Sequence, residues 1–130
     1  MKKTVCVLLF AFLLLAGCAP GKSEGNAIQI TLEIQGNDTN IFGPETVEAL
    51  DTDTVFVILK KICEQNDIPI AYSGTGSTVY VTQIAGLKEK QLGPMAGWLY
   101  EVNSEQPSKG MGKYTLSNED SVVIFYSVSP

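Results

Sequence analysis

The sequence predicts one domain of the α+β class, with a mixed or antiparallel sheet and one helix packed on one face of that sheet. Residues 27–35 alternate between apolar and polar side chains, a pattern typical of a strand with one face in water. Residues 53–65 carry the one clear apolar series at helical spacing. The other apolar segments are short and are separated by turn residues, which favours hairpin connections between strands.

The first half of the chain predicts two strands and then the helix. The strand 27–35 is followed by the turn residues GNDTN, and residues 44–50 can pair back onto it. We expect the helix to begin at Asp53, because aspartate suits the N-cap and places negative charge at the positive end of the helix. Pro69 prevents the helix from continuing. Its apolar face comprises Val55, Phe56, Leu59, Ile62 and Cys63.

The second half of the chain predicts further strands. Residues 68–73 and 78–84 form a predicted hairpin around the Gly-rich turn GTGS. After a polar connection, residues 97–103 alternate again and place Trp98, Tyr100 and Val102 on one side. A long Gly-containing loop then leads to residues 121–128, an apolar segment that we expect to be a strand buried on both faces.

The N-terminus has the features of a secretion signal. Lys2 and Lys3 precede an apolar run that is too short to span a membrane, and small residues follow it. The sequence LAGC at 15–18 resembles the lipobox of bacterial lipoproteins, in which the cysteine is acylated after cleavage. We therefore expect a signal peptide at 1–17, a lipid anchor on Cys18, a flexible tether at 18–26 and a domain at 27–130, outside the cytoplasm and attached to the membrane. The alternative is an ordinary secretion signal with a chance cysteine.

The composition excludes several function classes. The net charge is −5 and no basic patch is present, so nucleic acid is not an expected partner. The chain has no histidine, which removes the commonest general base and most zinc sites. Cys63 lies on the apolar helix face and has no basic neighbour, so we expect a packed and unreactive thiol. We therefore do not expect the protein to be an enzyme.

From the helix onward, the segments follow the order of a known family. AYSGTGSTVYVTQIAGL, GPMAGWLYEVN, the P-x-x-G-x-G-x-Y loop at 107–114 and LSNEDSVV resemble the transcobalamin-like C-terminal domain family, over about residues 28–127. Members are β-grasp-like domains, often on bacterial surface lipoproteins. In vertebrate cobalamin carriers such a domain covers one face of the vitamin together with a large helical domain, which has no counterpart in these 130 residues.

The resemblance implies where a ligand would bind. It places the ligand-facing side at the hairpin 74–78, the start of the strand at 97–98, and the loop 110–114. Cobalamin or another corrinoid is the candidate ligand, although no cofactor is certain. The candidate binding residues are Gly74, Thr75, Gly76, Ser77, Gly97, Trp98, Gly110, Met111, Gly112 and Tyr114.

The lone tryptophan has two interpretations. Trp98 either fills the core together with Tyr100, as aromatic residues of alternating strands commonly do, or is exposed at the start of its strand. We adopt the second as a hypothesis, in which Trp98, Met111 and Tyr114 form the rim of a binding surface while Tyr100 and Val102 lie deeper. Met111 lies between two glycines and is therefore expected outside the core.

The leading functional hypothesis is a membrane-anchored, non-catalytic module that binds a small molecule such as a corrinoid. One alternative is a cell-surface module that binds an extracellular protein or peptide, for instance by adding a strand to an open sheet edge. A weaker alternative is a calcium-like metal site in the acidic turns, with Asp38, Asp51 and Asp53 as candidate ligands. Helix capping by Asp53 competes with that last interpretation.

Overall fold

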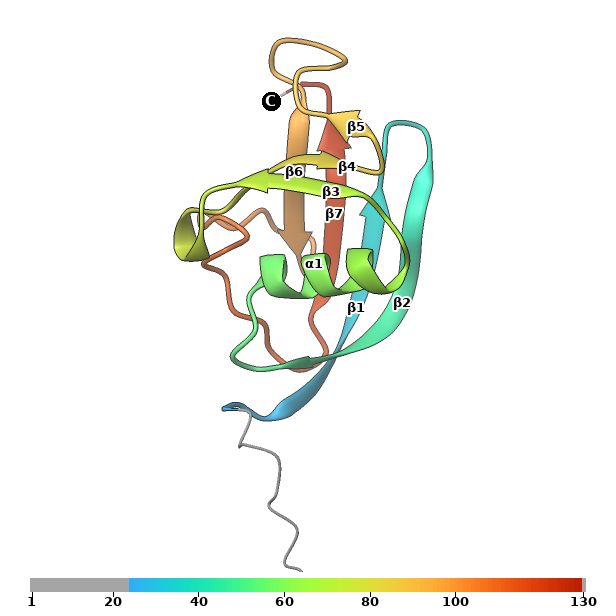
Figure 1. Ribbon diagram of the computed structural model, residues 1–130. Coiled ribbons are helices and arrows are strands. Elements are labelled where there is room, and N and C mark those ends of the chain that lie inside the picture. The colour runs from blue at the N-terminus through green and yellow to red at the C-terminus, as the bar shows by residue number, and fades with distance from the viewer. Residues whose placement is uncertain (1–23, 130) are drawn as a thin grey trace, which may run out of the picture.

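The computed structural model describes residues 24–129 (Figure 1). The predicted signal peptide, the lipid anchor Cys18 and most of the predicted tether lie outside these residues. The described chain contains one α-helix and seven strands, which confirms the predicted α+β class. The elements are β1 (Ala27–Gln35), β2 (Asn40–Leu50), α1 (Val55–Gln65), β3 (Ile70–Ser73), the short 3₁₀ helix η1 (Gly76–Thr78), β4 (Tyr80–Ile84), β5 (Leu87–Lys88), β6 (Gly97–Val102) and β7 (Ser121–Ser127).

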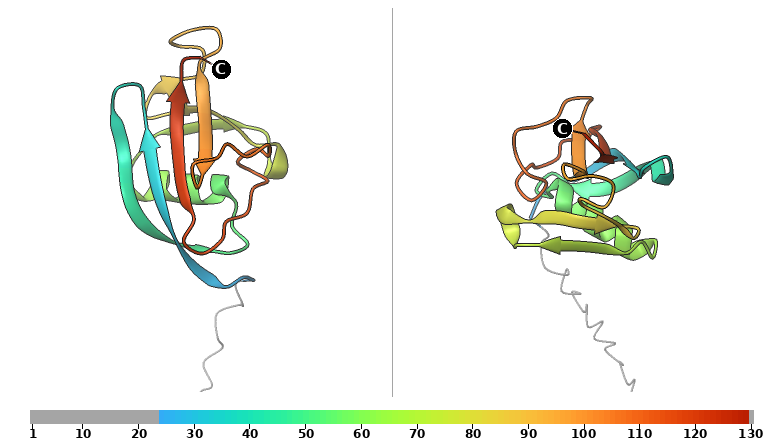
Figure 2. Two further views of the ribbon diagram at one scale, coloured as in Figure 1. Left: turned by 180° about the vertical axis from the view of Figure 1, so that it is seen from behind. Right: turned by 90° about the horizontal axis from the view of Figure 1, so that it is seen from above.

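The strands form two sheets instead of the expected single one. The larger sheet has the order β2-β1-β7-β6, in which β1 and β7 are parallel and the other neighbours antiparallel. The smaller sheet is antiparallel with the order β3-β4-β5. Both α1 and the smaller sheet lie on the same face of the larger sheet, and its other face is uncovered when seen from behind (Figure 2).

The core lies between the larger sheet and the elements that cover it. Each strand of that sheet contributes alternate residues to the core, as the alternating pattern of 27–35 and 97–103 predicts. β7 differs from the expectation, because Val123 and Phe125 point to the uncovered face and are only partly buried. The most completely buried side chains are Ile30, Leu32, Ile34, Val55, Ile58, Leu59, Cys63, Ile84, Val122 and Ile124.

The start of α1 corrects the capping prediction. Thr54 is the N-cap residue, and its hydroxyl oxygen accepts a hydrogen bond from the Val57 amide at 3.3 Å. The Asp53 carboxylate instead accepts a hydrogen bond from the Leu50 amide at 2.8 Å, and so closes the turn before the helix. The C-terminal end agrees with the prediction, because Asn66 is the C-cap. Among residues 24–129, no helix has the length and apolar character needed to cross a membrane.

Candidate binding cleft

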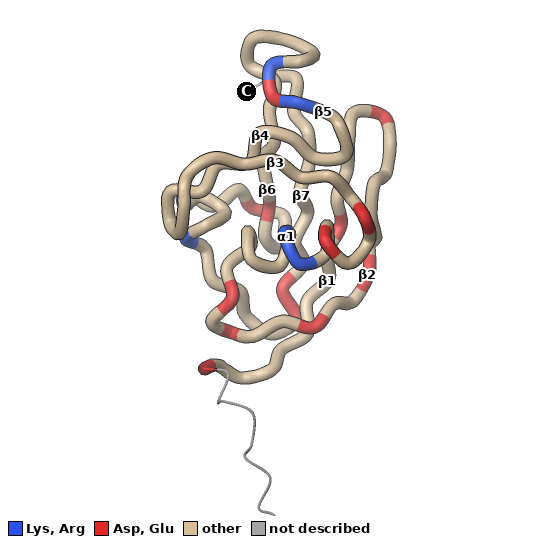
Figure 3. The backbone as a smooth tube through the Cα atoms, in the orientation of Figure 1, with Lys and Arg blue, Asp and Glu red and all other residues tan. Residues whose placement is uncertain are grey.

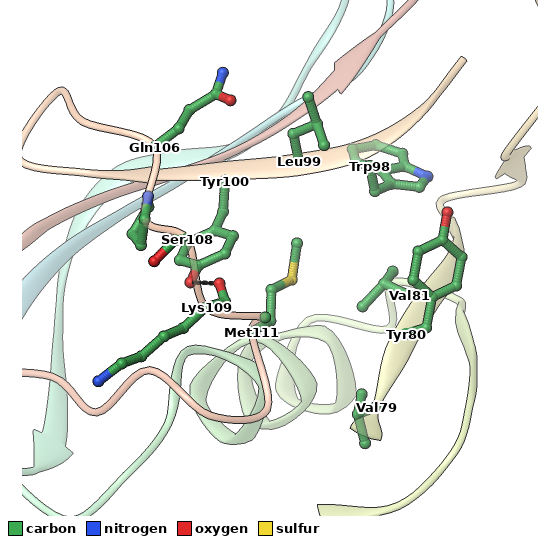
Figure 4. Close-up of a pocket in the computed structure, with 12 residues that line it drawn as sticks. Val79, Tyr80, Val81, Trp98, Leu99, Tyr100, Gln106, Ser108, Lys109 and Met111 are labelled. Atoms are coloured by element: carbon green, nitrogen blue, oxygen red, sulfur yellow. Dashed lines mark hydrogen bonds between the residues drawn. The ribbon is translucent and has the colours of Figure 1, made fainter. Parts of the chain in front are cut away.

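A cleft of about 290 Å³ opens at the outer edge of β6 (Figure 4). β6 is an edge strand of the larger sheet, β4 of the smaller sheet lies across from it, and the loop after β6 forms the remaining wall. The lining residues come from these three segments and from Val79 just before β4, and are Val79, Tyr80, Val81, Trp98, Leu99, Tyr100, Gln106, Pro107, Ser108, Lys109, Gly110 and Met111. The lining is mostly apolar, with a few polar groups from the loop.

Trp98 forms part of the cleft wall but is not exposed, which corrects the hypothesis that it anchors a ligand from the rim. Its side chain is only 4% exposed. The indole N–H donates a hydrogen bond to the Leu87 carbonyl at 2.9 Å, and the ring packs edge-on against Tyr126 at 5.3 Å between centroids. The physical reason is the second sheet, because β4 and β5 cover the inner face of β6 and bury its first aromatic residue.

Met111 is also buried, although its flanking glycines predict an exposed position. It is 7% exposed and belongs to the hydrophobic core. Its carbonyl accepts a hydrogen bond from the Phe56 amide at 2.9 Å, which ties the loop to the first turn of α1. The side chain points into the cleft between β6 and β4 (Figure 4). Met111 therefore contributes an adaptable apolar surface to the floor of the cleft.

Tyr100 fixes the loop that walls the cleft. Its hydroxyl donates a hydrogen bond to the Lys109 carbonyl (Figure 4), and its ring packs edge-on against Tyr114 at 6.2 Å between centroids. Burial raises the pKa of Tyr100 above its ordinary value, so the hydroxyl stays protonated and able to donate. Tyr100 is 7% exposed, as predicted for the deeper position on this strand. Tyr114 is partly buried and does not line the cleft.

The Gly-rich hairpin and the Gly-rich loop, which the resemblance assigns to the ligand-facing side, pack directly against each other. A Cβ atom on Gly112 would lie 2.3 Å from the Gly76 carbonyl oxygen, so this close approach requires glycine. Thr75 and Thr78 close the hairpin tip through their own hydrogen bonds. Of the candidate residues in the hairpin and loop, only Gly110 and Met111 line the cleft, whereas Gly74, Thr75, Gly76, Ser77, Gly112 and Tyr114 do not.

A second hollow of about 500 Å³ continues from the cleft along β6. It lies beneath the loop between β5 and β6 and includes Gly97, Met95 and Lys90 in its lining. The two hollows share the four residues Tyr80, Trp98, Leu99 and Gln106. A Cβ atom on Gly97 would lie 3.8 Å from the Tyr80 hydroxyl oxygen, so the Tyr80 side chain reaches from β4 to the start of β6 where the hollows meet.

Tyr80 is the most exposed aromatic residue of the cleft and is not among the candidates from the sequence. The other lining residues that are not candidates are Val79, Val81, Leu99, Tyr100, Gln106, Pro107, Ser108 and Lys109. Tyr80 is 51% exposed and stands at the junction of the two hollows. A hydrogen bond with the Glu89 carboxylate raises the pKa of the Tyr80 hydroxyl, and partial desolvation acts in the same direction. The alternating pattern of 78–84 contains a signal, because Val79 and Val81 are buried and Tyr80 is an aromatic residue on the opposite, solvent-facing side.

The three candidate metal ligands do not form a metal-binding group, and the carboxylates of Asp51 and Asp53 accept hydrogen bonds from nearby residues. The Asp51 carboxylate accepts hydrogen bonds from both the amide and the side chain of Asn26, and these lower the pKa of Asp51. Asp53 closes the turn before α1, and Asp38 occupies the β1–β2 turn with φ of 59°. Within the described chain, no group of three or more His, Cys, Asp or Glu residues is placed to hold a metal ion.

Cys63 is fully buried on the inner face of α1, as predicted. Burial raises the pKa of its thiol to about 11. A thiol with this pKa carries little thiolate near neutral pH, so it packs as a small apolar side chain.

Comparison with known proteins identifies the family. Residues 52–127 match the family described as a domain of unknown function, DUF4430. The chain belongs to the DUF4430 family. No curated protein matches this DUF4430 chain.

Two solved structures have similar folds. One is haptocorrin in complex with Cbi, with a TM-score of 0.68 and 18% sequence identity over 85% of this DUF4430 chain and 27% of haptocorrin. The other is a proposed metal-binding protein from Ruminococcus gnavus ATCC 29149, with a TM-score of 0.54 and 14% identity over 79% of this chain and 99% of that protein. At these identities the likeness is one of fold, and it confirms the predicted transcobalamin-like fold. The DUF4430 chain spans about a quarter of haptocorrin, as the 27% coverage states.

Proposed function

We propose that this DUF4430 protein is a non-catalytic module that binds a small molecule of the corrinoid class at the outer edge of β6. The observation that carries the proposal is the cleft between β6, β4 and the loop 106–111, with its apolar walls and its polar groups at one end. The likeness to haptocorrin, whose structure contains Cbi, supports corrinoids as the first ligands to test. The absence of histidine in the sequence supports a binding role over catalysis.

The size of the cleft indicates how such a ligand would be held. Small-molecule pockets that enclose their ligand usually measure about 300–1,000 Å³. The cleft, at about 290 Å³, is at the lower limit of that range and opens into the larger hollow beneath the β5–β6 loop. A large ring would therefore rest one edge against Tyr80 and Met111 and leave its other side uncovered by residues 24–129.

Titration with cobinamide tests this proposal. The chain is titrated with cobinamide and with cobalamin while the visible absorption of the corrinoid or the heat of binding is recorded. We expect saturable binding, and we expect Tyr80→Ala to weaken it by about tenfold or more, as loss of an aromatic contact does. The exposed position of Tyr80 means that this substitution removes contact area without opening the core.

Tyr72→Ala is the matched control for this titration. Tyr72 lies on the neighbouring strand β3, is 40% exposed and packs against Phe56, away from the cleft. We expect its substitution to leave the affinity unchanged. Equal effects of the two substitutions, or no saturable binding of either corrinoid, would contradict the proposed function.

We also propose that the protein is lipid-anchored outside the cytoplasm through Cys18. The basic start, the short apolar run and the sequence LAGC at 15–18 support this, although these residues lie outside the described chain. In cells fed a radiolabelled fatty acid, the Cys18→Ser variant should lose the label and keep its N-terminal segment. Cys63→Ser, which changes the buried thiol, serves as the control and should remain labelled. Undiminished labelling of Cys18→Ser would contradict the anchor.

A further inference from the structure

The backbone of β6 has a free hydrogen-bonding edge. Val102 exchanges hydrogen bonds with Glu105 on the side away from β7, at 2.9 and 3.1 Å, and the Ala96 carbonyl accepts from the Lys90 amide at 2.7 Å. The amide of the next residue, Asn103, donates instead toward β7, to the carbonyl of Ser121 at the start of that strand. The backbone groups of successive residues therefore point alternately toward β7 and away from it. The N–H and C=O groups of Trp98 and Tyr100 therefore point away from β7.

These four backbone groups pair with no other strand of residues 24–129, because β6 is the outermost strand of its sheet. The two hollows run along the same edge and meet at Trp98 and Leu99. Space for a neighbouring chain therefore lies beside unpaired groups at the spacing of a strand. The polypeptide backbone is the chemistry that complements such an edge, since it presents amide donors and carbonyl acceptors at the same intervals.

The other edge of the larger sheet is protected in a way that β6 is not. β2 carries Pro44, which has no amide hydrogen to donate, and the exposed carboxylates of Glu45 and Glu48. Prolines and charges on edge strands are devices that prevent pairing with other chains. The free segment of β6, Gly97–Tyr100, carries neither a proline nor a charged side chain.

The walls of the groove determine what the incoming strand would carry. Side chains that point inward would contact Tyr80 and Met111, so apolar residues at alternate positions fit this wall. Lys109 lines the first hollow and Lys90 the second, and both lysines are exposed. Glu89, next to Lys90 in the second hollow, is engaged by a hydrogen bond with the Tyr80 hydroxyl. Most acidic residues lie on other parts of the surface, over β1, β2 and the lower loops (Figure 3).

We propose that the edge of β6 binds an extended segment of another protein as an added strand, with apolar residues at alternate central positions and acidic residues at its ends. The bound strand would hydrogen-bond to Trp98 and Tyr100 and lie between Lys90 and Lys109. This inference goes beyond the proposed corrinoid binding. Because the strand would fill the cleft at Tyr80, a bound peptide and a bound corrinoid exclude each other.

The test uses the full chain in detergent micelles and a display library of random peptides of about 12 residues. We expect enriched peptides to alternate apolar residues between acidic ends. A saturating enriched peptide should slow hydrogen exchange at the amides of Trp98 and Tyr100 by about tenfold or more, because these amides become hydrogen-bonded. N-methylation of alternate residues of the peptide should abolish binding, since it removes the peptide amide hydrogens that would bond to the carbonyl groups of Trp98 and Tyr100.

Charge reversal provides the matched variants. Lys109→Glu should lower the affinity for the peptide by about tenfold or more. Lys61→Glu, at an exposed position on α1, should leave the affinity for the peptide unchanged. A library that yields no peptide, or peptides that leave exchange at Trp98 and Tyr100 unaltered, would overturn strand addition. If the protein binds cobinamide but no peptide, only strand addition is contradicted. If it binds a peptide but not cobinamide, only the proposed corrinoid binding is contradicted.

Discussion

Trp98→Ala should lower the free energy of unfolding by about 3–5 kcal/mol, the range for truncation of a buried aromatic residue. The indole is 4% exposed and packs edge-on against Tyr126. Its N–H also bonds to the Leu87 carbonyl, so the substitution opens a cavity and leaves a carbonyl of the smaller sheet without its partner. Urea unfolding of the variant beside the parent chain measures this loss.

Tyr80→Ala is the comparison for that experiment. Tyr80 faces the same cleft but is 51% exposed, so its removal should cost less than about 1 kcal/mol, as surface substitutions usually do. A loss below about 1 kcal/mol for Trp98→Ala as well would show that the indole is not a core residue.

Leu59→Ala should cost about 2–5 kcal/mol, because Leu59 is a full core position. Its exposed fraction is 0%, and it lies on the face of α1 that packs against the sheets. Val57 on the same helix is 47% exposed and gives a matched control. Val57→Ala should change stability by less than about 0.5 kcal/mol, since alanine has the higher helix propensity and little packing is lost. Equal effects of the two substitutions would mean that the buried face of α1 is assigned wrongly.

The elements with a strong period could be predicted from the sequence, whereas β5 and the separation of the strands into two sheets could not. The alternation of 27–35 and the apolar face of 53–65 both correspond to buried faces. β5 is only two residues long, too short for any period to be visible, so its segment has the composition of a polar connection. The alternation of 97–103 leaves both interpretations of Trp98 open, and the cover that β5 and β4 provide over β6 decides for the core.

The candidate site could be located only in part. The resemblance places Gly97, Trp98, Gly110 and Met111 near one another, and all four line the two adjoining hollows. It does not indicate that Gly112 serves close packing against Gly76, because this contact joins segments far apart in the chain. The alternation of 78–84 places Tyr80 on the solvent-facing side of its strand, but its position in the cleft depends on how the two sheets face each other, which is a tertiary relation.

The three methionines allow a direct test of where a corrinoid binds. Met111 points into the cleft, Met95 lines the neighbouring hollow and is 64% exposed, and Met1 lies outside the described residues. In a chain that begins at Cys18 and is labelled with ¹³C at the methionine methyl groups, Met95 and Met111 give the two signals, and cobinamide should shift the Met111 signal in a saturable way. An unchanged Met111 signal at saturating cobinamide, or a shift confined to Met95, would contradict binding in the cleft at the edge of β6.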